Sequence, residues 1–235
     1  MTALPWLYLG LLSLGYGLAS SFGQLGWLAL ISIALLVFAG YAVRQQTVPV
    51  GRYLGHGLFI VLALALALHW LPGFYNGRAI EPQRFTDNAV PFSMYLNLDK
   101  PLIGFWLLLV CPWIVARRSL RLTVYATALA LTLSVILALG GAVLLGMITW
   151  APKWPDQAWL WVLNNLLLVT LVEEALFRGY IQGGLSRRFQ HLPYGENLAL
   201  LLASLLFGLV HVGAGWQWVL LASLAGVSYL SLIHI

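Results

Sequence analysis

The sequence predicts an all-α polytopic membrane protein with about eight transmembrane helices. Hydrophobic residues make up 61% of its 235 positions and charged residues only 8%, whereas an ordinary soluble domain has about 25% charged residues. So few charged side chains cannot cover a core of this size with polar surface, and we expect lipid to take the place of that surface. The composition therefore excludes a soluble globular domain.

The individual spans follow from the length of the apolar runs. A spanning helix needs about 20 mostly apolar residues, and this criterion gives eight segments: residues 4–20, 26–43, 53–71, 101–116, 120–148, 158–186, 197–213 and 216–233. The fourth begins at Pro101, a favoured residue for a first helical turn, and Gly140-Gly141 is expected to interrupt the fifth. Residues 72–100 form the one long polar connection, which we expect to be irregular and to be either a lid or, as we favour, a connector.

The basic residues predict the orientation of these segments. The connections after the second, fourth and sixth segments share one side of the membrane and carry most of the unbalanced positive charge, with Arg44, Arg52, Arg117, Arg118, Arg121, Arg187 and Arg188. Cytoplasmic loops carry the excess of Lys and Arg, so these residues are interpreted as topology anchors and the N-terminus is placed in the cytoplasm. Because the net charge of +5 is scattered among short connections, it does not indicate a nucleic-acid partner.

Two adjacent glutamates lie inside the sixth segment. Residues 158–172 before them contain no charge, and a carboxylate at mid-membrane costs about 2.5–3.5 kcal/mol on insertion scales, so we expect the fold to use both. Glu174 and Arg178 are four residues apart on one helix face, where the guanidinium holds the carboxylate ionised. Glu173 points roughly a quarter turn away, toward another helix, which makes it a candidate general base. The alternative is that both glutamates only bind Arg178 and a neighbouring helix.

The seventh segment ends in Phe207-Gly-Leu-Val-His211. Alone, this histidine is more typical of helix packing than of chemistry. If the sixth helix continues to Arg187, Glu173 lies fourteen residues from that boundary and His211 lies fourteen residues from Asn197, so both reach a similar depth. If the sixth helix leaves the membrane at Arg178, the pairing weakens.

Taken together, Glu173-Glu-Ala-Leu-Phe-Arg178 has the form EExxxR and Phe207–His211 has the form FxxxH. In this order, on successive helices, the two motifs resemble those of the CPBP family of intramembrane proteases, which includes the CAAX prenyl endopeptidases and bacteriocin-processing relatives. The similarity covers about residues 158–230.

The resemblance implies an intramembrane endopeptidase that hydrolyses peptide bonds of membrane-associated or leader peptides. It implies that Glu173 and His211 activate the attacking water, with Glu174, Arg178 and Phe207 in support. It also divides the chain into N-terminal transmembrane helices of uncertain role, residues 1–149, and a protease-like core, residues 150–235. The expected location is the bacterial inner membrane.

The sequence departs from the family pattern at its end. Family members carry a further helix with a histidine and, four residues on, an asparagine or similar residue, which form an oxyanion hole. Here the sequence stops at Ile235, and His234 comes too early to be that histidine. The resemblance therefore implies a truncated protease, whose turnover as this chain alone is in doubt.

No cofactor is expected. The HExxH motif of zinc proteases is missing, and although Glu173, Glu174 and His211 together have the donor types of a three-ligand metal site, a glutamate-activated water needs no metal. The expected partners are the lipid bilayer and a peptide or protein substrate.

Other polar residues give weaker signals. His56, His69 and His191 have no acidic or histidine partner three or four residues away, so we expect surface or interface positions for them. Asn164 and Asn165 either line the same cavity as the glutamates or make a polar helix contact. Two rival functions stay open: a proton-coupled transporter, which the scarcity of ionisable residues in the first, second and fifth segments disfavours, and a non-catalytic scaffold or immunity-type protein.

Overall fold

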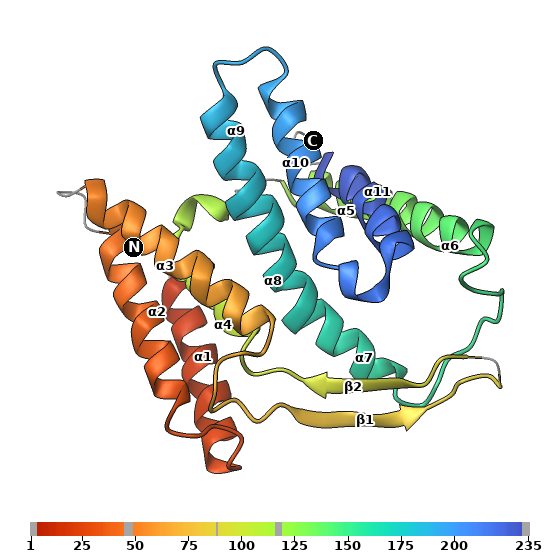
Figure 1. Cartoon of the computed structure of the whole chain (residues 1–235), viewed down its shortest axis with the longest axis horizontal. Helices are drawn as coiled ribbons and strands as arrows, with labels where there is room; N and C mark the ends of the chain where they lie inside the picture. The colour runs from red at the N-terminus through yellow and green to blue at the C-terminus, as the bar shows by residue number, and fades with distance from the viewer. Residues whose placement is uncertain (1–3, 45–48, 88, 116–118, 232–235) are drawn as a thin grey trace. The chain divides into compact units, whose positions relative to one another are not determined.

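The structure, a computed structural model, describes residues 4–44, 49–87, 89–115 and 119–231. Helices occupy all eight predicted positions (Figure 1). The chain divides into two compact units: unit 1 comprises Met1–Pro112 and Lys153–Glu173, and unit 2 comprises Trp113–Pro152 and Glu174–Ile235. The predicted anchors Arg117 and Arg118, and also His234, lie outside the described residues.

Unit 1 is mainly helical. Its elements are α1 (Leu4–Ser21), α2 (Ala29–Arg44), α3 (Pro49–Ala67), α4 (Pro101–Val110), α7 (Ala158–Asn164), the π-helical η3 (Asn165–Thr170) and α8 (Leu171–Glu173). Phe59 of α3 stacks on Trp106 of α4, with 3.8 Å between ring centroids, and the Trp106 indole donates a hydrogen bond to the carbonyl oxygen of Leu36 in α2. This buried contact joins three helices and satisfies the indole N–H.

The long connection in unit 1 is not the irregular segment that the sequence predicted. It contains β1 (Gly77–Gln83) and β2 (Phe92–Leu96), which pair antiparallel with two irregularities in register (Figure 1). Ile80 and Met94 are opposite each other and buried. Pro82 is tolerated because both strands of a two-stranded sheet are edge strands. The expectation was wrong because the burial of opposing side chains, Ile80 and Met94, stabilises the hairpin, and local propensity does not show that pairing.

All the regular elements that the structure describes in unit 2 are helical. They are α5 (Leu120–Val135), the π-helical η2 (Ile136–Gly140), α6 (Gly141–Leu144), the π-helical η4 (Glu174–Gln182), α9 (Gly183–Phe189), α10 (Gly195–Leu209) and α11 (Trp216–Leu230), with short 3-10 turns η1 (Pro112–Ile114), at the boundary with unit 1, and η5 (Val212–Ala214). Helices α10 and α11 lie side by side (Figure 1), with Gly226 against Ser204. Small residues at such contacts let membrane helices approach closely.

The adjacent glycines of the fifth segment do not interrupt it. The helix continues from Arg121 to Leu144, through a π-helical stretch that ends at Gly140. A Cβ on Gly141 would lie 2.5 Å from the side chain of Leu221 in α11. The glycine therefore serves close helix packing, and the expected break was wrong.

Three of the described helices are long and apolar enough to cross a membrane: Pro49–Ala67, Arg121–Leu144 and Ala158–Phe189. Four other apolar helices have only 10–17 residues: Ala29–Arg44, Pro101–Val110, Gly195–Leu209 and Trp216–Leu230. Many large apolar side chains on the helices are exposed, as lipid contact requires. The protein is therefore an α-helical integral membrane protein, and the number of eight spans is not confirmed.

The packing of α10 on α11 predicts the effect of one substitution. A Cβ on Gly208 would lie 1.9 Å from the Ser223 hydroxyl and 2.6 Å from the carbonyl oxygen of Val219. Since overpacking costs about 1–3 kcal/mol, Gly208→Ala should lower the thermal unfolding midpoint of the purified protein in detergent. Gly140→Ala is the matched control, because a Cβ there meets no described atom within 4 Å. A Gly208→Ala midpoint equal to that of the control would contradict this packing.

Candidate active site

The ion pair expected in the EExxxR motif is present in unit 2. Arg178 Nε lies 3.0 Å from Glu174 Oε2, and the two side chains are 30% and 36% exposed. Both residues belong to η4, a π-helical segment, and residues four apart remain on one side of it. Segments of π-helix are frequent at functional sites.

Arg178 also binds the C-terminal end of α11. Its Nη2 donates to the carbonyl oxygen of Tyr229 at 2.7 Å, and its guanidinium carbon lies 5.4 Å from the centroid of the Tyr229 ring. Gln182, which is fully buried, donates to the carbonyl oxygen of Leu230 at 3.2 Å. The last carbonyl groups of a helix have no partner within it and carry partial negative charge. Arg178 and Gln182 satisfy two of them and hold α11 to η4.

The sequence reasoning missed Gln182 and the end of α11. A signal for the glutamine was available, because Glu174, Arg178 and Gln182 follow one another at intervals of four and form a polar row on an apolar segment. No comparable signal exists for the carbonyl oxygen of Tyr229, because every residue has one.

Phe207 is the centre of an aromatic cluster in unit 2. Its ring centroid lies 5.1 Å from those of Phe177 and His211 and 5.4 Å from that of Tyr229, in each case with a steep angle between the rings. Edge-to-face contacts of this kind fix ring orientation. The motif phenylalanine therefore positions His211 and links it to the helix end that Arg178 binds.

The backbone of α10 sets the orientation of His211. The helix ends at Leu209, and His211 precedes the short turn Val212–Ala214. Its Nδ1 lies 2.9 Å from the carbonyl oxygen of Phe207. A carbonyl oxygen only accepts, so Nδ1 carries the hydrogen and the lone pair of the neutral imidazole is on Nε2.

Glu173 is the last residue of unit 1, at the end of α8. Gly104 of α4 makes room for the preceding Val172, since a Cβ on Gly104 would lie 3.0 Å from the Val172 side chain. The helix that carries Glu173 continues to Phe189, and the point at which it leaves the membrane stays a prediction. Its meeting with His211, which belongs to unit 2, stays a prediction. Among the described residues, no three His, Cys, Asp or Glu side chains are grouped to hold a metal ion.

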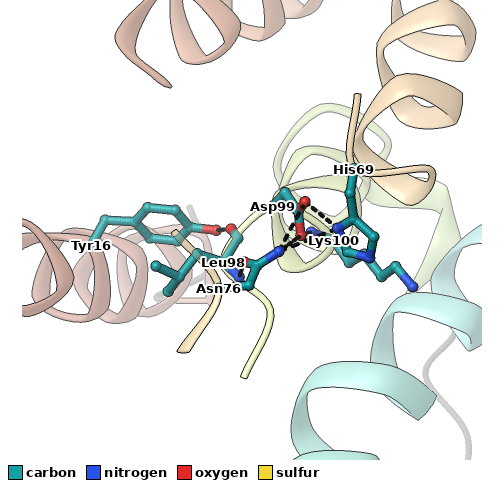
Figure 2. A network of polar contacts seen from close by, with 6 residues as sticks. All are labelled: Tyr16, His69, Asn76, Leu98, Asp99 and Lys100. Atoms are coloured by element: carbon teal, nitrogen blue, oxygen red, sulfur yellow. Dashed lines mark hydrogen bonds and ion pairs between the residues drawn. The ribbon is translucent and has the colours of Figure 1, made fainter. Parts of the chain in front are cut away.

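A second polar cluster, in unit 1, gives His69 a distant acidic partner. Its Nδ1 lies 2.5 Å from Oδ2 of Asp99 (Figure 2), whose side chain is 2% exposed. Asn76 lies beside both residues and accepts a hydrogen bond from the backbone N–H of Leu98. His69 is exposed, as predicted; its acidic partner lies thirty residues away, beyond the spacings of three and four that the sequence argument covered.

Comparison with known proteins agrees with the two motifs. Residues 155–234 match the model of a family described as Rce1-like, type II CAAX prenyl endopeptidase. No curated protein and no solved structure matches the chain. The matched part contains EExxxR, FxxxH and α11. The match supports CPBP family membership for the part of the chain that it covers, residues 155–234.

Proposed function

We propose that the protein is an intramembrane endopeptidase that hydrolyses membrane-associated or leader peptides with a water activated by Glu173 and His211. The observation that carries the proposal is the hydrogen bond from His211 Nδ1 to the Phe207 carbonyl oxygen, 2.9 Å long. Because this bond fixes the tautomer, Nε2 is the nitrogen that accepts a hydrogen bond from water.

In the proposed reaction, the Glu173 carboxylate takes a proton from the water while His211 Nε2 orients it. The water oxygen attacks the carbonyl carbon of the scissile peptide and forms a tetrahedral intermediate. The proton then passes from Glu173 to the leaving nitrogen, and the C–N bond breaks. General acid–base assistance of this kind contributes about 10²–10⁴-fold to a rate.

Glu174 and Arg178 have a supporting role in this proposal. Arg178 connects Glu174 to the end of α11, so it fixes the helix that carries both glutamates. A guanidinium that already binds one carboxylate and one carbonyl oxygen has a structural role in this proposal.

The test is cleavage of a fluorogenic membrane peptide by the full-length protein in liposomes. We expect one cleaved peptide bond, identified by mass spectrometry, and the same rate in EDTA, because a glutamate-activated water needs no ion. If no peptide of a varied set is cleaved, the non-catalytic scaffold becomes the better assignment. A rate that EDTA abolishes and zinc restores would contradict the proposed mechanism.

We also propose that the protein lies in a bacterial inner membrane with its N-terminus in the cytoplasm. The basic connections described above support this orientation. Reporter fusions after Arg44 and after Arg188 should then both report a cytoplasmic position, and a fusion after Trp150 a position outside. The opposite pattern would overturn the orientation.

A further inference from the structure

Unit 1 contains a cavity of about 520 Å³. One wall consists of the consecutive β2 residues Phe92, Ser93, Met94 and Tyr95, and another consists of Trp161, Asn164 and Asn165 around the end of α7. Figure 1 shows β2 lying between β1 and α7. His69 and Asn76, from the cluster around Asp99, also line this space.

The lining indicates that the cavity runs along the edge of β2. Successive side chains of a strand point to opposite faces, so four consecutive residues cannot line a cavity that touches only one face. Among the described residues, β2 pairs with β1 alone, which leaves its other edge with backbone N–H and C=O groups directed away from the sheet. Such an edge is a template for another extended chain.

The chemistry of the lining is neutral and rich in amides. Of the ten described residues that line the cavity, four are asparagines, and none is Asp, Glu, Lys or Arg. Anionic ligands are normally held by Arg or Lys, and hard cations by carboxylates. Carboxamides provide donors and acceptors that match those of a peptide main chain.

His69 is held in one orientation at this cavity. Its Nδ1 donates to Asp99, which also accepts from the backbone N–H of Lys100 (Figure 2). Because Nδ1 uses its hydrogen there, the nearby amide of Asn76 donates to the carboxylate and not to the ring. His69 has φ +56°, a backbone conformation that residues other than glycine seldom adopt and that often marks functional sites. Its Nε2 is the nitrogen that can bind a ligand.

We propose that this cavity binds an extended polypeptide segment along the free edge of β2. The proposal rests on the proposed function, because the segment would be part of the protease substrate. An adjoining apolar pocket of about 310 Å³ shares Phe92 and Trp161 with the cavity and suits a large apolar side chain of the segment. Main-chain pairing at a strand edge provides affinity, and neighbouring pockets provide specificity.

The position of the cavity within unit 1 suits a substrate subsite. Asn165 and Glu173 lie on the same helix, eight residues apart, which is at most about 12 Å along its axis. About four extended residues cover such a distance. A segment bound at β2 would therefore place a peptide bond within reach of Glu173 a few residues away.

The test measures peptide binding without hydrolysis. The full-length Glu173→Gln protein in lipid nanodiscs is titrated into a fluorescent peptide of alternating valine and threonine, and binding is followed by fluorescence anisotropy. A second peptide of the same sequence has every second amide N-methylated, which removes the donors of one edge. We expect it to bind at least about tenfold more weakly, because several main-chain hydrogen bonds are lost at once. If the peptides only partitioned into lipid, the N-methylated peptide would bind more strongly, since N-methylation makes a peptide more apolar.

Two variants locate the site. Asn164→Leu keeps the side-chain volume but removes a carboxamide, and we expect it to weaken binding about fivefold. Asn197→Leu, at an exposed position of α10, is the matched control and should bind as the parent does. Equal binding of the two peptides, or equal binding by the two variants, would overturn the proposal. If the cavity binds the peptide as expected but the wild-type protein cleaves no substrate, the peptide site stands and the proposed function fails.

Discussion

Replacing Glu173 with glutamine is expected to lower kcat for peptide cleavage by about 10²–10⁴-fold. Glutamine has almost the same shape as glutamate, but its carboxamide cannot take a proton from water. Since only the proton-transfer step loses its base, KM should change little. The measurement is the steady-state cleavage of a fluorogenic membrane peptide by wild-type and Glu173→Gln proteins in the same lipid.

The matched control for this experiment is Glu174→Gln. Glutamine keeps the size of the side chain but has no charge, so this variant loses the ion pair with Arg178 Nε, 3.0 Å long in the wild-type protein. We expect a loss of less than about tenfold in kcat, because a partly exposed ion pair contributes little. Equal, partial losses in both variants would indicate that the two glutamates have a structural role only.

The features that the sequence predicted correctly are local ones. Apolar runs located all eight helical segments, because the backbone in lipid must satisfy its own hydrogen bonds. The Glu174–Arg178 pair followed from a spacing of four on one helix. Both arguments use only residues that are close together in the chain, and both agree with the structure.

The features that the sequence did not predict depend on distant residues or on the backbone. Asp99 and His69 are thirty residues apart, and no local rule pairs a residue that follows α3 with one that precedes α4. The hairpin depends on opposing side chains such as Ile80 and Met94, which are meaningful only once the strands have paired. The bond from Arg178 to Tyr229 ends on a carbonyl oxygen, which no residue type identifies.

The number of spans was not confirmed because the sequence argument measured the length of apolar runs and did not locate the residue at which each helix ends. Gly195–Leu209 and Trp216–Leu230 each have 15 residues, which is about 22 Å of helix, against about 30 Å of hydrocarbon. The turn between them contains Gly215 at φ +111°, a conformation open to glycine and strained for other residues. The expected segment 197–213 ran past the helix end at Leu209 into this turn, since Val210, Val212 and Gly213 are also apolar or small.

The second large effect is expected at Arg178. Replacing it with methionine keeps much of the side-chain length but leaves Glu174 without its cation and the Tyr229 carbonyl oxygen without this donor. Breaking a fully buried pair costs about 3–5 kcal/mol. Because these two side chains are about one third exposed, we expect a loss of about 2 kcal/mol in the free energy of unfolding. Chemical unfolding of the purified protein in detergent measures it, with Arg188→Met at an exposed position of α9 as the control.

A double variant separates the ion pair from the other contacts of Arg178. In Glu174→Gln with Arg178→Met, no uncompensated carboxylate remains, so the double variant should be more stable than Arg178→Met alone. A coupling of about 1 kcal/mol between the two substitutions is expected for groups in direct contact. Strict additivity would mean that Arg178 stabilises unit 2 through the end of α11 alone, and that Glu174 needs no counterion. In that case the second glutamate of the motif would need a different role from the one that its spacing predicts.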